Sequence, residues 1–441
     1  MVNRLDDDRE FKDSVLGMIP KDWDVWNIEE IIDNIIDFRG KTPLKIGMTW
    51  GGGDIPALSA NNVEMGKINL EKETNYASEA LYKKWMNKGD TKKGDIIITM
   101  EAPLGNIAQI PDNKKYILSQ RVLLFKTKKD LIYNDFFKNF LLSDLFQNKL
   151  KSYSSGTTAT GIQQSKLLKL PIIVPPIPEQ QQIAKILDRV DKAIAQTETL
   201  IAKYKRVKTG LMQDLLTRGI DENGQLRDRT THKFKRSPLG MIPDEWEVVA
   251  TAQITKSLVP GRDKPNLDGG GIPWITIPDI DAMYISASKN GLSLSLKAVK
   301  SANARLMPKG TVIMSCVGEF GIATITREDV VANQQLHGFI CSDDILPEWL
   351  VAQINASGTR IDNMATQTTI KYLNKTGCES ILLALPKLAE QKRAISLLSN
   401  SLSFIATQEK YLAKLHAIKT GLMQDLLTGK ISIKPLLTNE P

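Results

Sequence analysis

The sequence has 441 residues, of which 42% are hydrophobic and 24% are charged, and its formal net charge is +8 at pH 7. A chain of this length can bury several cores, and the positive charge favours a polyanionic partner such as nucleic acid. The three cysteines lack the spacing of a disulfide framework or a zinc site, and no signal peptide or long apolar stretch is present, so we expect a cytoplasmic protein outside the membrane.

The chain begins with a motif that returns in its second half. Residues 11–25 read FKDSVLGMIPKDWDV and residues 234–248 read FKRSPLGMIPDEWEV, so ten of fifteen positions are identical at an offset of 223. The Gly-Met-Ile-Pro sequence is typical of a turn, and the Trp that follows leads into a predicted first strand. We interpret the motif as a packing segment that opens each of two related domains.

The landmarks after this motif also occur twice. The pairs are FRGKTP at 38–43 with VPGRDKP at 259–265, GGGDIPAL at 51–58 with GGGIPWI at 269–275, KGDIIIT at 93–99 with KGTVIMS at 309–315, GNIA at 105–108 with GIA at 321–323, and SQR at 119–121 with NQQ at 333–335. Short β-branched runs punctuated by Gly and Pro predict a β-rich mixed module of about 165 residues in each half.

Each module closes with the same succession of elements. Helical spacing of apolar residues predicts a helix at 134–151, with a counterpart at 347–357. Polar loops follow, SYSSGTTATG at 152–161 and NMATQTTI at 363–370. Strands at 170–174 and 382–386 then lead through Pro and Glu, which are N-terminal helix signals, into two long helices.

The long helices are the clearest feature of the sequence. Residues 179–217 place mostly apolar side chains at alternating steps of four and three, the seam of a coiled coil, and the same register returns 211 positions later. Both copies end in the identical sequence KTGLMQDLLT, at 208–217 and 419–428. About 39 residues at 1.5 Å each make a rod of roughly 58 Å. Because both seams contain polar residues, we expect the helices to pair with each other.

The sequence therefore predicts an α+β fold with an internal pseudo-two-fold repeat, in which two β-rich mixed domains are separated by two long antiparallel coiled-coil helices. The predicted parts are a first domain at 11–178, a helix at 179–218, a polar and solvated linker at 219–233, a second domain at 234–389 and a helix at 390–428. Two similar domains on a fixed scaffold could hold two segments of a DNA duplex at a set separation.

The repeated motifs together resemble the specificity subunit of type I restriction-modification systems. The residues that carry the resemblance are GMIPKDW at 17–23 and GMIPDEW at 240–246, GDIPALSANNV at 53–63, KKGDIIIT with PLGNIA, PPIPEQQQIA, and the two KTGLMQDLLT segments. The resemblance covers about residues 10 to 430. It implies two target recognition domains that each read one half of a bipartite double-stranded DNA target, with the helices setting the gap.

The resemblance also implies partners that carry the chemistry. Two methyltransferase subunits would bind S-adenosylmethionine and flip the target adenine, and restriction subunits would use ATP and Mg²⁺. In this chain we expect no catalytic residue, cofactor or metal. Gly40-Lys41-Thr42 lacks the leading glycine of a phosphate-binding loop, Val174-Pro175-Pro176-Ile177 does not match the amino-methylation motif, and the three histidines are scattered.

Candidate DNA-binding residues are the amide, hydroxyl and cationic side chains that recur at corresponding positions, because such groups read base edges and phosphates. In the first domain they are Arg39, Lys41, Thr42, Asn61, Asn62, Gln120, Arg121, Thr157 and Thr158; in the second they are Arg262, Lys264, Gln334, Gln335, Thr366, Gln367 and Thr368. Each could instead be a turn or surface residue, Asn61 and Asn62 could cap a turn, and Gln120 could be a buried amide. Since corresponding residues differ, we expect an asymmetric target.

The repeated helix ends are the predicted partner-binding segments, since two similar helices offer a docking surface to two copies of one partner. The candidate residues are Lys208, Leu211, Leu215, Lys419, Leu422 and Leu426. Two alternatives remain at this point. One is a non-catalytic coiled-coil adaptor, which would lack the steep salt dependence of phosphate contacts. The other is a self-contained DNA-modifying enzyme, which would be active with S-adenosylmethionine or Mg²⁺ alone.

Overall fold

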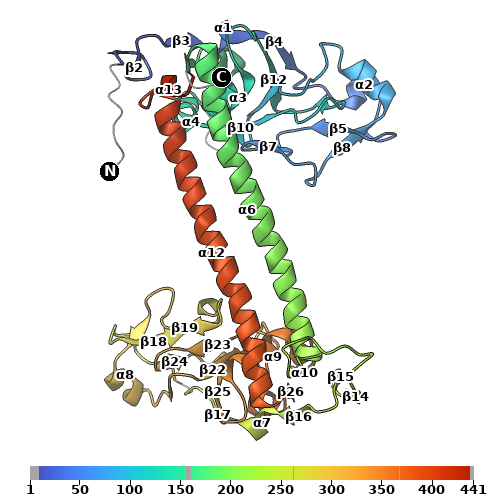
Figure 1. The fold of residues 1–441 in the computed structure, drawn as a ribbon, viewed down its shortest axis with the longest axis vertical. Helices are drawn as coiled ribbons and strands as arrows, with labels where there is room; N and C mark the ends of the chain where they lie inside the picture. The colour runs from blue at the N-terminus through green and yellow to red at the C-terminus, as the bar shows by residue number, and fades with distance from the viewer. Residues whose placement is uncertain (1–8, 155–159, 262, 367, 438–441) are drawn as a thin grey trace. The chain divides into compact units, whose positions relative to one another are not determined.

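The computed structural model describes residues 9–154, 160–261, 263–366 and 368–437. The chain divides into two compact units, which are described separately below. Unit 1 contains the described residues up to Glu198 and those from Lys410 onward, and unit 2 contains Thr199–Glu409. Each unit therefore combines one β-rich domain with the first half of one long helix and the second half of the other (Figure 1).

Unit 1 is built around strand β9, which is covered on both faces. The main sheet has the order β10-β9-β12-β4 and is antiparallel, and a smaller sheet has the order β11-β5-β8. Ile96 and Ile98 of β9 belong to one hydrophobic core, whereas Ile97 belongs to another, because successive side chains point to opposite faces of a strand. The strands are β1 (Phe11–Lys12), β2 (Ile19–Pro20), β3 (Asp24–Asn27), β4 (Ile32–Asp37), β5 (Ile55–Leu58), β6 (Val63–Glu64), β7 (Lys67–Ile68), β8 (Asn75–Ala77), β9 (Ile96–Met100), β10 (Leu104–Gln109), β11 (Ile117–Leu118), β12 (Val122–Thr127) and β13 (Pro171–Val174).

Short helices cover the sheets of unit 1. They are α1 (Ile28–Ile31), η1 (Pro43–Ile46), α2 (Glu79–Trp85), α3 (Asn134–Leu142), α4 (Asp144–Ser152), α5 (Gln164–Leu168) and α13 (Lys434–Leu437). The prediction of one continuous helix at 134–151 is wrong. Ser143 is extended, with φ −70° and ψ 151°, and its hydroxyl accepts a hydrogen bond from the backbone N–H of Phe146, so it ends α3 and caps α4.

Unit 2 repeats this plan with different details. Its sheets have the orders β17-β25-β22-β23-β19 and β20-β18-β24-β21, and β22 lies between β25 and β23 as β9 lies between β12 and β10. The strands are β14 (Phe234–Ser237), β15 (Gly240–Pro243), β16 (Glu247–Ala250), β17 (Thr255–Leu258), β18 (Ile272–Ile275), β19 (Tyr284–Ile285), β20 (Ser293–Leu294), β21 (Leu306–Met307), β22 (Val312–Ser315), β23 (Ala323–Thr326), β24 (Val330–Ala332), β25 (Leu336–Cys341) and β26 (Leu382–Leu385). The helical segments are α7 (Thr251–Ile254), η2 (Ile277–Asp279), α8 (Leu296–Ser301), α9 (Pro347–Ala356), α10 (Gly358–Met364) and α11 (Lys375–Glu379).

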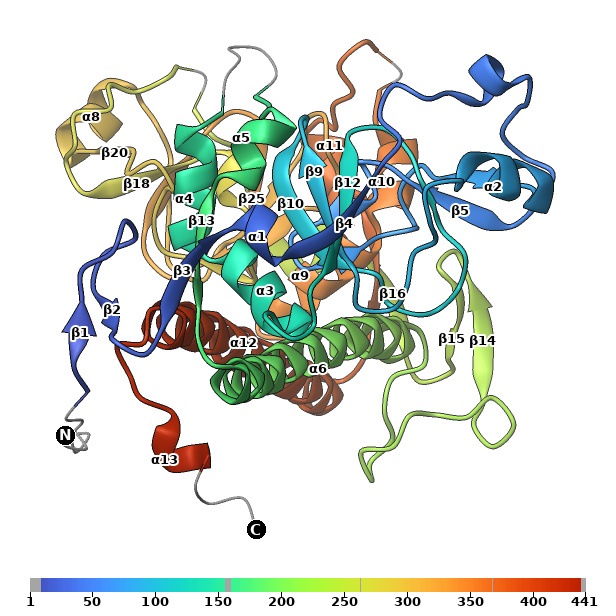
Figure 2. The same ribbon diagram turned by 90° about the horizontal axis from the view of Figure 1, so that it is seen from above.

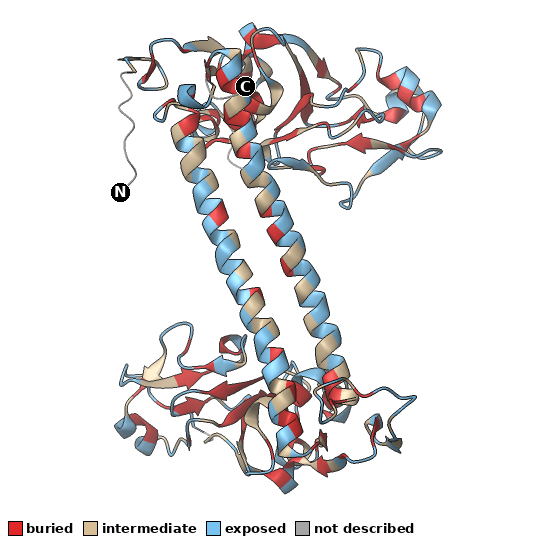
Figure 3. Ribbon diagram, in the orientation of Figure 1, coloured by how far each residue is buried: buried red, intermediate tan, exposed pale blue. Residues whose placement is uncertain are grey.

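Burial follows this plan in both units. In Figure 3 the central strands of each domain are mostly buried, whereas the long helices alternate exposed positions with scattered buried ones. That alternation is the amphipathic pattern expected of a helix that packs along one stripe. Among the described residues, no helix combines the length and the apolar character needed to span a bilayer.

The two long helices, α6 (Ile177–Thr217) and α12 (Leu388–Leu426), pack against each other within each unit. In unit 1, the Lys419 ammonium on α12 lies 2.6 Å from the Asp191 carboxylate on α6. In unit 2, the Tyr204 and Phe404 rings lie 4.2 Å apart. The start of one helix shares a hydrophobic core with the end of the other in both units, so the pair is antiparallel. The predicted fold class is therefore confirmed.

The same buried hydrogen bond ties each helix start to its domain. Trp23 Nε1 donates to the Glu179 carboxylate at 3.2 Å, and Trp246 Nε1 donates to the Glu390 carboxylate at 3.2 Å. All four side chains are buried. The Trp and the Glu both come from sequence motifs that occur twice, so the repeat in sequence corresponds to a repeated contact.

A buried arginine completes this contact in unit 2. Arg227 donates to both carboxylate oxygens of Glu390 and, at 2.8 Å, to Glu245. Burial alone would lower the pKa of Arg227, but the hydrogen bonds and charges of Glu390 and Glu245 together raise it. The solvated linker predicted at 219–233 is therefore only partly correct, because Ile220 and Arg227 within it are buried.

We predict that Glu390→Ala lowers the free energy of unfolding by about 3 kcal/mol, because it leaves the buried Arg227 guanidinium without its partner. Glu245→Ala removes the other carboxylate from the same arginine, but its side chain is 64% exposed, so we expect a loss under about 1 kcal/mol. Urea unfolding of the full chain, followed by circular dichroism, measures both. Equal losses in the two variants would contradict this assignment.

Unit 2 also contains a buried histidine, His337, whose ring lies 4.7 Å from that of Phe339 and forms a hydrogen bond of 3.1 Å with the Ser257 hydroxyl. Burial lowers the pKa of His337 to about 4; the Glu379 carboxylate opposes this shift and Lys375 adds to it. The unfolded chain takes up this proton near its ordinary pKa of 6.5. Between these values the unfolded state binds more protons, so stability falls as the pH falls.

We therefore predict that His337 destabilises the fold by about 3 kcal/mol as the pH drops from about 6.5 to about 4. This pH-dependent loss of stability should be absent in His337→Gln. It should remain in His416→Gln, because His416 is exposed. The measurement is the difference in unfolding free energy between wild type and each variant across this pH range, since carboxylates titrate in all three proteins. A pH-independent difference for His337→Gln would show that the histidine does not titrate in this way.

Candidate nucleic-acid interface

Two of the predicted residues of unit 1, Arg39 and Arg121, lie next to the ends of strands β4 and β12. Arg39 follows β4, and its side chain donates to both carboxylate oxygens of Asp37, at 2.8 to 3.1 Å, and to Gln164 at 2.9 Å. Burial alone would raise the pKa of Asp37, but the hydrogen bonds from Arg39 hold the pKa of that carboxyl below its usual range. Arg121 precedes β12, and its Nε lies 3.3 Å from Glu101 Oε1. Both arginines are thus paired with carboxylates near the surface.

These pairs border a hollow of about 570 Å³, whose lining includes Asp37, Arg39 and Glu101. Gly161, which ends the predicted polar loop, lies on the same wall and forms an isolated β-bridge with Glu101. The structure therefore brings Arg39, the Arg121–Glu101 pair and the end of this loop together. The predicted residues Thr157 and Thr158 lie outside the described residues.

A neighbouring hollow of about 500 Å³ is lined by the predicted residues Lys41, Thr42 and Gln120, together with Trp50. Lys41 Nζ donates to the Trp85 carbonyl at 2.9 Å and lies 5.0 Å from the centre of the Phe38 ring. Burial lowers the pKa of Lys41, and Lys88 lowers it further.

The three predicted residues in this hollow differ in whether their side chains can contact a ligand. Lys41 is engaged by the protein's own backbone and rings. The Thr42 side chain caps η1 by accepting from the Lys45 N–H. Gln120 is exposed, so the alternative of a buried amide is wrong. Lys41 and Thr42 shape the wall, while Gln120 is free to contact a ligand.

The two predicted asparagines have different environments. Asn62 is completely buried: its amide oxygen accepts from the Ser59 N–H at 3.0 Å, and its amide nitrogen donates to Thr74 Oγ1 at 2.8 Å. A side chain with these partners holds a turn together and cannot reach a duplex, so the DNA-binding prediction for Asn62 does not fit the structure. Asn61 is exposed and lines a hollow of about 330 Å³.

In unit 2 four of the predicted residues, Gln334, Gln335, Thr366 and Thr368, lie in two loops beside Cys316. Gln334 and Gln335 are exposed in the turn before β25, and the Gln335 carbonyl accepts from the Cys316 N–H at 2.9 Å. On the other side, the Thr366 N–H donates to the Tyr372 carbonyl at 3.0 Å, and the Thr366 and Thr368 hydroxyls lie 3.1 Å apart. Val317, the residue after Cys316, forms an isolated β-bridge with Tyr372, so Cys316 and Val317 connect the two loops. Lys264 is exposed elsewhere in unit 2, and Arg262 and Gln367 lie outside the described residues.

Sequence reasoning missed the residues that accompany these arginines. Glu101 and Asp37 hold Arg121 and Arg39, and Trp50 forms part of a wall beside Gln120. A signal was present for Glu101, because it lies between two aligned motifs, KGDIIIT and GNIA, at the position of Val317 in the other half. Among the described residues, no group of three or more His, Cys, Asp or Glu side chains could hold a metal ion.

The predicted partner-binding leucines face inward. Leu215 and Leu426 are buried in the cores of their units, and Leu211 and Leu422 pack against those cores while partly exposed. These leucines therefore stabilise the units themselves. Lys208 is half-buried, and Lys419 pairs with Asp191.

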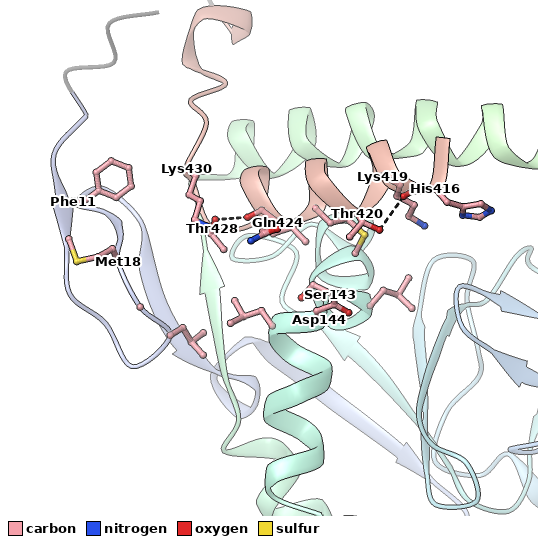
Figure 4. Close-up of a pocket in the computed structure, with 16 residues that line it drawn as sticks. Phe11, Met18, Ser143, Asp144, His416, Lys419, Thr420, Gln424, Thr428 and Lys430 are labelled. Atoms are coloured by element: carbon pink, nitrogen blue, oxygen red, sulfur yellow. Dashed lines mark hydrogen bonds between the residues drawn. The ribbon is translucent and has the colours of Figure 1, made fainter. Parts of the chain in front are cut away.

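The outward face of the second repeated segment borders a cavity of about 660 Å³ in unit 1. Its walls are the hairpin of β1 and β2, the turn between α3 and α4, and the last turns of α12, which lie beside one another in Figure 2. Figure 4 shows Thr420 and Gln424 of α12 on one side and Ser143 and Asp144 on the other. Met18 of the hairpin is 53% exposed. The repeated segment thus packs inward with leucines and presents polar side chains outward.

Comparisons with known proteins agree with this architecture. The chain is 25% identical over 437 residues to the putative type I restriction enzyme MjaX specificity subunit of Methanocaldococcus jannaschii, covering 96% of this chain and 97% of the relative. It is 25% identical over 440 residues to the MjaVIII specificity subunit of the same organism, covering 95% of each chain. It is 20% identical over 394 residues to the EcoKI specificity subunit of Escherichia coli K12, covering 85% of this chain and 81% of the relative.

Solved structures share the fold. A chain from a study of complex assembly and conformational transition of the type I R-M system matches with a TM-score of 0.59 and 17% identity, covering 94% of this chain and 99% of that one. The type I restriction-modification S subunit from M. genitalium matches with a TM-score of 0.53 and 14% identity, covering 92% and 96%. The family model of the type I restriction modification DNA specificity domain matches twice, at residues 20–206 and 243–417, which together make up most of the chain. The chain therefore belongs to the family of type I restriction-modification DNA specificity proteins.

Proposed function

We propose that this chain is the subunit that gives a type I restriction-modification complex its DNA sequence specificity. Each unit reads one half of a bipartite, asymmetric double-stranded target, and the long helices set the gap between the halves. This proposal rests on one observation: exposed cationic or amide side chains lie beside the central sheet at equivalent places in both units. We call this place the corner of each unit. Such side chains read base edges in the major groove.

The asymmetry of the target follows from differences between these corners. The unit 1 corner contains Arg39, Arg121 and Gln120, whereas the unit 2 corner contains Gln334 and Gln335. Arginine is suited to guanine and phosphate, while glutamine is suited to adenine. The two half-sites therefore differ in sequence. The net charge of +8 supports binding to a polyanion that weakens steeply as salt rises.

The chemistry belongs to partner subunits in this proposal. Two methyltransferase subunits bind S-adenosylmethionine and methylate adenine, and restriction subunits supply ATP- and Mg²⁺-dependent cleavage. The complex acts in the cytoplasm, where it meets cellular DNA. The identical outward faces of the two KTGLMQDLLT segments, one in each unit, provide equivalent docking surfaces for two copies of one partner.

The test of this function is a base-resolution map of N6-methyladenine in cells that express the chain with its methyltransferase subunit. We expect a split, asymmetric motif that is absent when the chain is omitted. Purified complex should bind a duplex containing that motif more tightly than a scrambled duplex at the same salt concentration. A stable complex that produces no new motif, or a palindromic motif, would overturn the proposal.

The docking surfaces can be tested by placing a large charged side chain on each. Thr420 and Thr209 are equivalent, exposed positions whose hydroxyls donate to the carbonyls four residues earlier, at 3.1 and 3.0 Å. Thr420→Arg and Thr209→Arg should each reduce the bound methyltransferase subunits from two to one, and the double variant should bind none. Thr407→Arg, at an exposed position of α12 outside the repeated segment, should still bind two. Native mass spectrometry counts the subunits, and two copies on the double variant would place the docking surface elsewhere.

A further inference from the structure

The Glu101–Arg121 ion pair of unit 1 occupies positions at which unit 2 has two uncharged residues. The backbone around it is the same in both units. The Met100 N–H donates to the Arg121 carbonyl at 2.8 Å, as the Cys316 N–H donates to the Gln335 carbonyl at 2.9 Å. Arg121 therefore corresponds to Gln335. Each residue directly precedes the strand that pairs with the central strand, β12 in unit 1 and β25 in unit 2.

A second set of contacts fixes the position of Glu101. The Ile162 N–H donates to the Met100 carbonyl at 3.2 Å, and the Leu373 N–H donates to the Cys316 carbonyl at 2.9 Å. The next residue in each unit forms an isolated antiparallel bridge to the polar loop, Glu101 with Gly161 and Val317 with Tyr372. Glu101 therefore corresponds to Val317.

The nearby Asp37–Arg39 pair is also confined to unit 1. In the strand registers, Ile36 of β4 pairs with Leu124 and Leu258 of β17 pairs with Gly338, which are equivalent positions of β12 and β25. Counting onward, Asp37 corresponds to Val259 and Arg39 to Gly261. Unit 2 keeps the same backbone scaffold with no ionised side chain at these places. The ion pairs of unit 1 are therefore not required by the fold.

The geometry of the pair leaves it open to a ligand. Arg121 and Glu101 are each 50% exposed, and Arg121 Nε lies 3.3 Å from Glu101 Oε1. Arg121 has a φ of +65°, in the left-handed region that a non-glycine residue rarely adopts. Its carbonyl is held by the Met100 N–H. Unusual backbone conformations of this kind collect at binding sites, where the surrounding structure maintains them.

We propose that Glu101 and Arg121 together read one G·C base pair in the half-site of unit 1, and that Val317 and Gln335 read an A·T base pair at the equivalent position in the half-site of unit 2. This inference rests on the proposed function. The Arg121 guanidinium donates to O6 and N7 of guanine, and the Glu101 carboxylate accepts from the N4 amino group of the paired cytosine. The Gln335 amide matches N6 and N7 of adenine, and Val317 contacts the methyl group of thymine.

The carboxylate also makes this contact selective. A phosphate group could take the place of Glu101 beside Arg121, because it too offers acceptor oxygens to a guanidinium. A phosphate has no hydrogen-bond donor for the displaced Glu101 carboxylate, and its negative charge would repel that carboxylate. A G·C pair satisfies both side chains, whereas an A·T pair in the same place offers the carboxylate no cytosine amino group. Glu101 is thus a specificity-determining residue rather than only a structural partner of Arg121.

The experiment exchanges the two pairs in the full chain, co-expressed with its methyltransferase subunit, and maps the methylation motif. The double variant Glu101→Val/Arg121→Gln should change one G·C pair to A·T in one half-site and leave the other half-site unchanged. The reciprocal variant Val317→Glu/Gln335→Arg should change one A·T pair to G·C in the other half-site. The unchanged half-site in each variant shows that the complex is still folded and assembled.

Isosteric single variants keep the test decisive where an exchange abolishes methylation. For purified wild-type complex, we expect affinity for the motif duplex to exceed that for a duplex with A·T at this position by about ten-fold. Glu101→Gln should reduce this ratio several-fold, and the charge-matched variant at the exposed Glu29, Glu29→Gln, should not. An unchanged ratio in Glu101→Gln, or motif changes in the wrong half-site, would overturn the inference while leaving the proposed function intact. A wild-type chain that directs no motif would instead refute the proposed function.

Discussion

The buried glutamate at the start of each long helix is the constraint on which the rest of the structure depends. Glu179 and Glu390 accept hydrogen bonds from the tryptophans of the repeated first motif, each at 3.2 Å. A buried carboxylate without partners would be strongly unfavourable, so these contacts must form together. They bind the first segment of each domain to the helix that leaves it, although roughly 150 residues separate them.

The residue after each glutamate extends the same junction. The Gln180 amide donates to the Pro175 and Leu131 carbonyls at 2.7 and 3.0 Å, and the Gln391 amide donates to the Pro386 and Asp344 carbonyls, both at 2.9 Å. The Pro175 and Pro386 carbonyls lie just before α6 and α12. The Leu131 and Asp344 carbonyls lie just before α3 and α9. Pro175 and Pro386 are buried, so without the glutamine amides their carbonyls would lack a hydrogen-bond partner in a buried place. The Glu-Gln dipeptide thus orients each long helix relative to its own domain.

The repeated helix ends complete each junction from the opposite direction. In unit 1 the core includes Leu426 and Leu427 from the end of α12, and in unit 2 it includes Leu215 and Leu216 from the end of α6. The two ends meet nearly the same environment, which explains why KTGLMQDLLT is identical in both. The arginine beside the glutamate differs in origin: Arg9 comes from before the first motif, whereas Arg227 comes from the segment after α6.

Local signals were sufficient for the long helices and the repeat, because their periodicity and turn residues lie within short stretches of sequence. The same signals failed where a distant contact decides the outcome. Ser143 interrupts an apolar helical pattern by capping α4. Buried Asn62 donates a hydrogen bond to Thr74, which lies 12 positions away, and Lys41 donates one to the Trp85 carbonyl, 44 positions away. The sequence therefore indicated candidate residues of the site, but not the carboxylates that pair with its arginines.

The division between backbone and side-chain contacts explains how one scaffold can hold different side chains at equivalent places in the two units. The loops at the candidate interface are fixed by bonds between main-chain atoms, such as those from Met100 and Cys316. Main-chain bonds do not depend on side-chain identity, so Arg121 in one unit and Gln335 in the other occupy equivalent places without disturbing the sheet. Residues such as Trp23 and Glu179, whose side chains hold the junctions, cannot vary in this way. The repeat is therefore exact where side chains build the junctions, and it is less exact at the candidate interface, where Arg121 corresponds to Gln335.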